Sequence, residues 1–330
     1  GNIGCMMNCA YCHNWKTSQA RQVAEDDVHR YTPQEVVALA LRHGIRVLSW
    51  TYNDPVVWHE FVTETATLAR AHGLLNLYKS AFYISEQAIA ELLPLIDIFS
   101  LSLKSMDPAY YRKLTKGELA PVLAGIKQVH RSGRHLELST LMITDLSDDE
   151  DTARAVSRFV LDELDASVPL HFVRFHPDYQ MTGSIRTPIP RLERARALAL
   201  ELGVRHVYLG NVYDHDATHT ACGSCGTRLV ERYGMIARGV GLDGSRCASC
   251  GAESGIRGGV AEARALDHAP LAPGLRLSEH RWQGDLRSLH VQVRNDSALP
   301  REVRHRPLER PGWTVIRLQP GESHRFILAK

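Results

Sequence analysis

The sequence predicts an α/β fold in which parallel strands alternate with helices, followed by a cysteine-knuckle region and a small β-rich C-terminal domain. Three observations support this prediction. Short apolar runs alternate with amphipathic helical stretches from residue 31 to about residue 212. Seven cysteines form two tight groups, with none between residues 13 and 221. Residues 270–330 carry β-type segments punctuated by Asn-Asp and Pro-Gly pairs.

Six predicted strands make up the first part of the chain. Residues 32–35 read Thr-Pro-Gln-Glu, a capping box with Pro at the first helical position, and a helix follows. The strands are expected at residues 45–50, 75–78, 96–103, 136–143, 170–175 and 206–209. The intervening helices are expected at residues 55–71, 85–93, 148–164 and 190–202, with several helical stretches from residue 107 to about residue 132. This rhythm predicts parallel strands with right-handed crossovers, in an open sheet or a closed barrel.

Composition excludes several classes of protein. Of 330 residues, 44% are hydrophobic and 23% are charged, values that rule out wholesale disorder and fibrous repeats. The 39 Lys and Arg residues nearly balance the 37 Asp and Glu residues, so the net charge of +2 makes no case for nucleic acid or an anionic membrane. No apolar run approaches the ~18 residues of a membrane span. The sequence opens at Gly1, inside a loop that we expect to be functional. A native segment upstream of Gly1 is therefore one expectation.

The two cysteine groups indicate two metal sites. An odd number of cysteines in two distant clusters does not fit a disulfide framework. Free metal-binding thiols require a reducing compartment, so we expect a cytoplasmic location.

The first cluster, Cys5, Cys9 and Cys12, has CxxxCxxC spacing. One loop can wrap three such thiolates around one iron–sulfur cluster, and a [4Fe–4S] cube would then keep one iron open for a non-protein ligand. An open coordination position is typical of a catalytic metal site. The alternatives are a zinc site completed by His13, or inert buried cysteines.

The cysteine loop resembles that of radical SAM enzymes, in which an aromatic residue, here Tyr11, precedes the last cysteine. The resemblance is strongest to the AmmeMemoRadiSam system radical SAM enzymes, relatives of the pyruvate formate-lyase activating enzyme. It is carried by Cys5–Trp15, by Thr-Tyr-Asn-Asp-Pro at residues 51–55, and by Arg-Phe-His-Pro-Asp-Tyr at residues 174–179. It covers about residues 1–258.

This resemblance implies a partial (β/α) TIM-like barrel with the cluster at its top. It implies that the open iron chelates S-adenosylmethionine, whose reductive cleavage gives a 5′-deoxyadenosyl radical that abstracts a substrate hydrogen. An electron donor such as flavodoxin or ferredoxin is the implied partner, and the substrate is a protein glycine, a peptide or a small metabolite. The alternative function is an iron–sulfur and zinc protein that transfers electrons or scaffolds a partner.

The resemblance also implies cofactor-binding residues. Asn53 and Asp54 lie in the turn expected to hold the methionine ammonium, where Asp54 replaces the family's Glu; helix capping is the alternative role. Lys104 is expected near the methionine carboxylate, although Ser102 stands where the family has Asp. His176 is expected near the ribose, and Tyr11 joins this cofactor-binding set. Asp178 and Tyr179 are candidates to face the substrate.

The second cluster repeats CxxCG around Cys222, Cys225, Cys247 and Cys250. Four thiolates without an open position predict a closed tetrahedral zinc, with a rubredoxin-like iron as the rival. Four residues after the first knuckle are candidates to dock this region onto the barrel: Arg228, Glu231, Arg232 and Tyr233.

The predicted domains are residues 1–213 (barrel), 214–259 (zinc-ribbon-like region) and 260–330 (β domain). In the last domain, strands are expected at residues 289–293, 314–318 and 325–328. Residues 276–310 hold eight Arg against five acidic residues, which indicates either a solvated β surface or a weak phosphate-binding face.

Overall fold

The chain forms two compact units in the computed structural model, Gly1–Gly259 and Val260–Lys330, and each is described by itself. The structure describes residues 1–19, 21, 23, 28–212, 215–233, 236–256, 275–283, 288–295, 300–305 and 314–328. The division of the chain into three domains stays a prediction.

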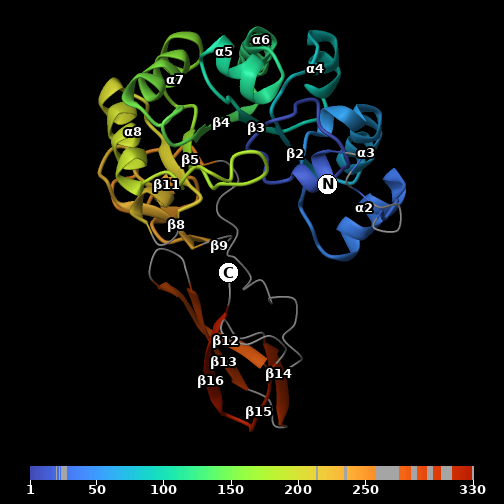
Figure 1. Ribbon diagram of the computed structural model, residues 1–330, viewed down its shortest axis with the longest axis vertical. Helices are drawn as coiled ribbons and strands as arrows, with labels where there is room; N and C mark the ends of the chain where they lie inside the picture. Colours follow the sequence, from blue (N-terminus) through green and yellow to red (C-terminus); the bar gives the residue numbers. More distant parts are fainter. Residues whose placement is uncertain are drawn as a thin grey trace. The chain divides into compact units, whose positions relative to one another are not determined.

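A six-stranded parallel sheet forms the centre of the larger unit (Figure 1). Its strands are β1 (Val47–Trp50), β2 (Leu75–Ser80), β3 (Ile98–Ser102), β4 (His135–Met142), β5 (Leu170–Arg174) and β6 (Val207–Gly210). They pair in sequence order, each parallel to the next. All six predicted strands are present, and the predicted α/β partial barrel is confirmed. Because the strands are parallel, their carboxyl ends lie along one edge of the sheet.

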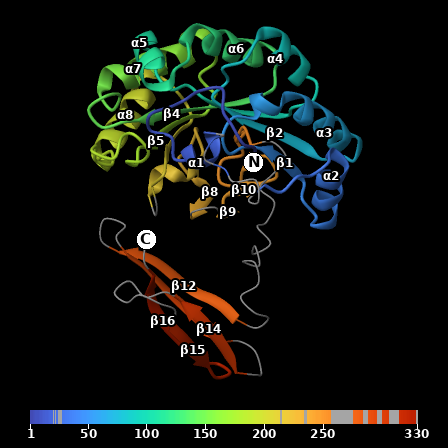
Figure 2. The ribbon, with the colours of Figure 1, turned by 45° about the vertical axis from the view of Figure 1, so that its right-hand side comes forward.

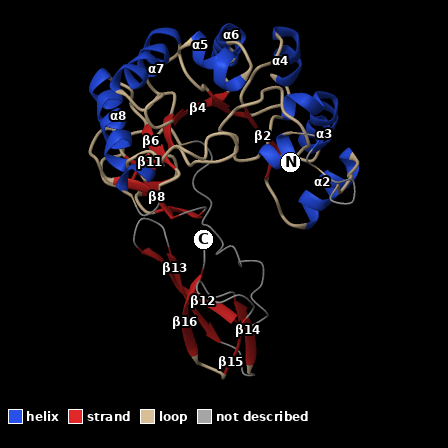
Figure 3. Ribbon diagram, viewed as in Figure 1, coloured by secondary structure: helices blue, strands red, loops and turns tan. Residues whose placement is uncertain are grey.

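Helices cover the outer face of the curved sheet (Figures 2 and 3). They are α2 (Pro33–Arg42), α3 (His59–Ala71), α4 (Glu86–Leu92), α6 (Leu119–Arg131), α7 (Glu150–Glu163) and α8 (Ile189–Leu202). The expected capping box is present, since Thr32 accepts from the Glu35 N–H and Glu35 from the Thr32 N–H. The helix predicted at residues 55–71 opens with a 3-10 turn, η3 (Pro55–Trp58).

The helical stretches predicted between residues 107 and 132 are present and are separated by a turn. The stretch expected to be helical over residues 107–132 begins with α5 (Pro108–Tyr110) and a π-helical turn, η4 (Tyr111–Thr115). It then stops at Lys116, whose φ of 60° lies in the left-handed region, before α6 begins. A Cβ on Gly117 would lie 3.1 Å from Cε of Met7. The cysteine loop therefore packs where a continuous helix would run.

Alternation along the strands separates the core from the concave face. Strand β4 alternates strictly between half-buried and fully buried side chains. The buried set faces the helices, and its largest members include Tyr78, Phe99 and Phe172. The half-buried set lines the concave side, where the register aligns Ser102 with Ser139, Ser139 with His171, and His171 with Tyr208. A polar row thus crosses four strands.

The four-cysteine region packs against the end of this row. It consists of the antiparallel strands β7 (Thr220–Ala221), β8 (Arg228–Tyr233) and β9 (Ile236–Gly239) and the hairpin of β10 (Leu242–Asp243) and β11 (Arg246–Cys247). The Tyr208 hydroxyl lies 3.0 Å from Oγ1 of Thr220, and the Arg232 guanidinium lies 5.5 Å from the Tyr208 ring centroid. The expected docking role fits Arg232. Arg228 instead pairs with Asp216 and Glu231 inside the region.

The smaller unit is a β structure. Strands β12 (Leu275–Gln283), β13 (Ser288–Asn295) and β16 (Ser323–Leu328) form one antiparallel sheet, and β14 (Arg301–His305) pairs with β15 (Thr314–Leu318). The three expected strands are present. Strands β12 and β14 were not predicted, because charged and His residues interrupt their apolar alternation. The Pro311-Gly312 turn and much of the Arg-rich stretch lie outside the described residues. No helix in the described part of the chain is long and apolar enough to span a membrane.

Candidate active site

The CxxxCxxC loop lies across the carboxyl edge of the sheet. The Ala10 N–H donates to the Leu114 carbonyl at 2.9 Å, in the segment that follows β3. The Ala10 carbonyl accepts from the Gln180 N–H at 3.0 Å, in the loop that follows β5. These backbone bonds hold the loop between two segments that are far apart in the sequence.

The three thiols of this loop are half-buried and unpaired. Burial raises the pKa of Cys5 to about 12, and the negative charge of Asp54 adds to this rise. Burial also raises the pKa of Cys9, against the lowering effect of the Lys104 ammonium. Such thiols need a bound cation to stay ionised, and thiolates are the ligands of iron–sulfur clusters. The donor set therefore fits a cluster.

Tyr11 is buried rather than turned toward solvent. It is 4% exposed, and its ring centroid lies 6.2 Å from that of Tyr110. The structure therefore places Tyr11 in the core beneath the loop, where it supports the loop from below.

The turn after β1 presents a buried carboxylate. Oδ1 of Asp54 accepts hydrogen bonds from Oγ of Ser80 at 2.7 Å and from the Val56 N–H at 3.4 Å. Oδ2 has no hydrogen-bond partner among the described residues. Burial raises the pKa of Asp54 to about 6, although Ser80 and the Lys104 ammonium lower it. One oxygen of Asp54 caps η3, which agrees with the helix-capping role predicted as the alternative. Its other oxygen is free to accept from a ligand ammonium.

Asn53 braces the cysteine loop. Its side-chain amide donates to the Asn2 carbonyl, and its Oδ1 accepts from Oγ1 of Thr17 at 3.1 Å. The Asn2 side chain in turn donates to the Asp54 carbonyl at 3.2 Å. The Asn53 side chain is thereby occupied within the protein, so the backbone of its turn is the part left to contact a ligand.

Lys104 follows the carboxyl end of β3. Its backbone N–H donates to the Tyr111 hydroxyl at 3.0 Å. Its ammonium is close enough to Asp54 and Cys9 to lower the pKa of both groups. The fold therefore brings a carboxylate, an ammonium and the cysteine loop together from three separated segments.

His176 is exposed beside the cysteine loop. Its Nδ1 accepts from Nε of Arg186 at 2.8 Å, and its backbone carbonyl lies 2.8 Å from Nε2 of His13. In the same loop Tyr179 stacks on Trp15 with 5.3 Å between ring centroids. The segment after β5 therefore contacts the cysteine loop directly.

Unusual backbone conformations concentrate at this edge. A positive φ strains a residue that has a side chain, and such strain gathers at ligand-binding sites. In the described part of the chain, the non-glycine residues with positive φ lie in loops that follow strands, except Lys116, which ends η4: Tyr52, Asn53, Phe82, Lys116, Asp145, Tyr179 and Asn211. The carboxyl edge of the sheet is thus where the candidate site residues come together and where most of these strained backbone conformations occur.

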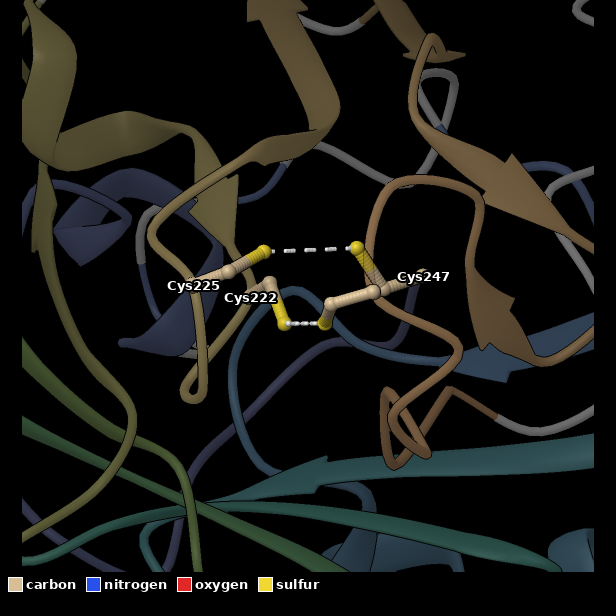
Figure 4. A group of neighbouring side chains, drawn as sticks. Cys222, Cys225 and Cys247 are labelled. Atoms are coloured by element: carbon tan, nitrogen blue, oxygen red, sulfur yellow. Dashed lines mark hydrogen bonds between the residues drawn. The ribbon is translucent and has the colours of Figure 1, made fainter.

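The second cysteine group forms a tetrahedral cage (Figure 4). The Cys222 and Cys250 sulfurs lie 3.7 Å apart, and the Cys225 and Cys247 sulfurs lie 3.6 Å apart. All four sulfurs lie within 4.8 Å of one another. A zinc ion with Zn–S bonds of about 2.3 Å sets its sulfurs about 3.8 Å apart. The cage fits one metal ion, and the geometry suits zinc and iron equally.

The two knuckles have matching turns. Gly226 and Gly251 take φ values of 75° and 72°, and each donates its N–H to the carbonyl of the first cysteine of its knuckle. Only glycine adopts this conformation without strain, which explains the Gly that follows each CxxC.

Comparison with known proteins shows which family shares this architecture. The family model of the Radical SAM superfamily matches residues 2–156, which include the cysteine triad, Asp54 and Lys104. An uncharacterized protein of Methanocaldococcus jannaschii is 37% identical over 252 residues, covering 75% of this chain and 74% of the relative. The chain belongs to the radical SAM superfamily. The pyruvate formate-lyase 1-activating enzyme of Escherichia coli is a more distant relative of this radical SAM protein, 22% identical over 219 residues, or 61% of this chain and 87% of that enzyme.

Solved structures show the same fold. A radical SAM methyltransferase from Sphaerobacter thermophilus has a TM-score of 0.51 at 14% identity, covering 69% of this chain and 68% of that chain. Streptococcus suis SuiB bound to S-adenosylmethionine has a TM-score of 0.51 at 9% identity, covering 64% of this chain and 49% of that chain. At these identities the similarity is one of fold.

Sequence reasoning did not single out two site residues. Ser80 orients Asp54 through a hydrogen bond. Lys79 precedes Ser80 in β2, and its side chain lies on the opposite face of the strand. Both sit near the end of a predicted strand. A polar residue at a strand's carboxyl end was the available signal.

Proposed function

We propose that this protein is a radical SAM enzyme that cleaves S-adenosylmethionine reductively and abstracts hydrogen from a substrate. A [4Fe–4S] cluster held by Cys5, Cys9 and Cys12 would supply the electron that splits the cofactor into methionine and a 5′-deoxyadenosyl radical. Superfamily membership supports this chemistry. A low-potential donor such as flavodoxin or ferredoxin is the proposed source of the electron. Seven unpaired cysteines fit a reducing, cytoplasmic setting.

The protein's own groups would bind and orient the cofactor. The unpaired Oδ2 of Asp54 accepts from the methionine ammonium, and the Lys104 ammonium faces the methionine carboxylate. Asn53 holds the turn that presents Asp54 against the cysteine loop. Tyr11 supports that loop, and His176, which lies beside it, would contact the ribose.

One observation carries the proposal: a buried carboxylate with a free oxygen lies within electrostatic range of both an ammonium and the cysteine triad. An amino acid carries one charge of each sign, so this arrangement matches the methionine part of the cofactor. The second site would hold a structural metal, zinc or a rubredoxin-like iron, because its four thiolates leave no open position.

The test is anaerobic reconstitution with iron and sulfide, followed by incubation with S-adenosylmethionine and dithionite. We expect about four irons per chain at the first site and formation of 5′-deoxyadenosine, measured by chromatography. Cys9→Ala should abolish this product, while the exposed-surface variant Lys113→Ala should retain it. Product formation by a variant lacking all three cysteines would refute the mechanism.

A further inference from the structure

The concave face of the sheet carries a lysine that takes no part in the proposed cofactor contacts. Along β2, the buried residues Asn76, Tyr78 and Ser80 alternate with the half-buried Leu77 and Lys79. The Asn76 side chain donates to the Ala66 carbonyl on α3, so the buried set faces the helices. Lys79 therefore lies on the concave side.

The Lys79 ammonium reaches across β3 to the next strand. Its Nζ donates to Oγ of Ser139 at 2.9 Å, and Oγ of Ser139 lies 3.3 Å from Oγ of Ser102. Because the register aligns Ser102 with Ser139, the two hydroxyls stand side by side at one end of the polar row. Three hydrogen-bonding groups from three strands thus converge on one point.

No carboxylate in the described part of the chain pairs with this ammonium. An acid that acts electrostatically on Lys79 is Glu137, whose two oxygens already bind Nε2 of His135 at 3.0 Å and Nε2 of His171 at 2.9 Å. Burial and the neighbouring Lys104 charge lower the pKa of Lys79 to about 8. An ammonium has three donors, and the described residues supply one acceptor. A second positive charge nearby makes the location more favourable for an anion.

We propose that Lys79, with Ser102 and Ser139, binds an anionic group of the substrate, a carboxylate or a phosphate, on the concave face. This inference rests on the proposed function, in which the substrate is the molecule from which hydrogen is abstracted. Charge favours the substrate over the cofactor as the source of the anion. S-adenosylmethionine has a single carboxylate, which the proposed function pairs with Lys104. Lys79, one residue before the end of β2, is a second ammonium close enough to Lys104 for that charge to lower its pKa, so it is left for an anion of another molecule.

The experiment measures anion binding to the anaerobically reconstituted full chain by equilibrium dialysis, with labelled inorganic phosphate and labelled acetate as separate probes. We expect Lys79→Met to weaken the tighter probe roughly ten-fold or more, and Lys79→Arg to restore most of the affinity. The matched control is Lys127→Met, which removes a half-buried lysine paired with Glu163 on the outer helices and should leave both affinities unchanged. The probe that binds more tightly identifies the group as carboxylate or phosphate.

S-adenosylmethionine titration of the same variants separates the two sources of the anion. An affinity within about two-fold of wild type in Lys79→Met supports a substrate group. A loss equal to that of Lys104→Ala would assign the anion to the cofactor and overturn the inference. Equal probe binding by wild type and Lys79→Met would overturn it as well. If Lys79→Met does not fold, Ser139→Ala provides the same comparison with a smaller expected loss. Dialysis requires no turnover, so failure to form 5′-deoxyadenosine would count against the proposed function alone.

Discussion

Ser80 Oγ donates a 2.7 Å hydrogen bond to Oδ1 of Asp54, while Oδ2 of the same carboxylate has no hydrogen-bond partner among the described residues. The serine therefore fixes the orientation of the carboxylate and leaves one buried oxygen for a ligand. A buried acceptor without a donor is costly, so we expect a bound molecule, such as the proposed cofactor or a water, to satisfy it.

Removing this carboxylate should weaken cofactor binding. A charge-assisted hydrogen bond contributes about 1.5–3 kcal/mol, so Asp54→Ala should lose roughly ten- to a hundred-fold in S-adenosylmethionine affinity. The measurement is a spectroscopic titration of cofactor into the reconstituted cluster. Asp162→Ala, at an exposed position on α7, is the control. Unchanged affinity in Asp54→Ala would show that the ammonium binds elsewhere.

Cofactor affinity should depend on pH through Asp54. Burial raises its pKa to about 6 in the unliganded protein, and only the ionised form attracts an ammonium. Affinity should be nearly constant from about pH 6 to about pH 7, below the range near pH 8 in which an α-amino group loses its own proton, and fall by up to about ten-fold for each pH unit below pH 6. Asp54→Asn should bind more weakly and lose this dependence. The same titration at several pH values is the check, and an identical pH profile in the variant would contradict the assignment.

The raised pKa also predicts an effect on stability. The folded state binds the Asp54 proton more tightly than the unfolded chain, whose Asp pKa is about 3.9, so folding stability is lost as pH rises from about 4 to about 6. The free energy of unfolding lost over this pH range amounts to about 3 kcal/mol. Without cofactor, Asp54→Asn should therefore be more stable than wild type at pH 7, with no such advantage at pH 4. Anaerobic urea unfolding at both pH values measures this, and a less stable variant at pH 7 would contradict it.

Lys104 should act on the cofactor without affecting the cluster. Lys104→Ala is expected to weaken S-adenosylmethionine binding roughly ten- to a hundred-fold. Iron content and the cluster's absorption should remain those of wild type, because its ammonium is no thiolate ligand. The exposed Lys113→Ala serves as the control. Loss of iron from Lys104→Ala would instead indicate a role in holding the cysteine loop.

The four-cysteine cage should contribute to folding through its metal. Cys250→Ser removes one of four ligands, and metal binding is coupled to local folding, so the variant should lose one equivalent of metal and become less stable. The spectrum of the iron–sulfur cluster should not change. Elemental analysis combined with thermal unfolding tests this. Well-folded wild-type protein with no metal beyond the cluster would refute a metal at this site.

Much of the fold could be predicted because its determinants are local. Apolar periodicity placed all six parallel strands, and the CxxC-Gly spacing anticipated the cage in which Cys222 and Cys250 lie 3.7 Å apart. The strands β12 and β14 were missed because charged residues hide their alternation. The position of the break between the predicted helical stretches, at Lys116, was not predicted, and beside it Gly117 packs against Met7 from a distant part of the chain.

The sequence by itself determined which chemical groups this protein carries and near which strand ends they stand. The cysteine spacings, Asp54 and Lys104 could all be read from motifs a few residues long. Only the tertiary structure decided which of these groups meet. Ser80 reaches Asp54 across 26 residues, and Lys79 reaches Ser139 across 60. The physical reason is that parallel pairing sets the register between strands separated by whole helices. That register depends on packing throughout the sheet, so no local pattern reveals which oxygen of Asp54 is free or that Lys79 lacks a described carboxylate partner.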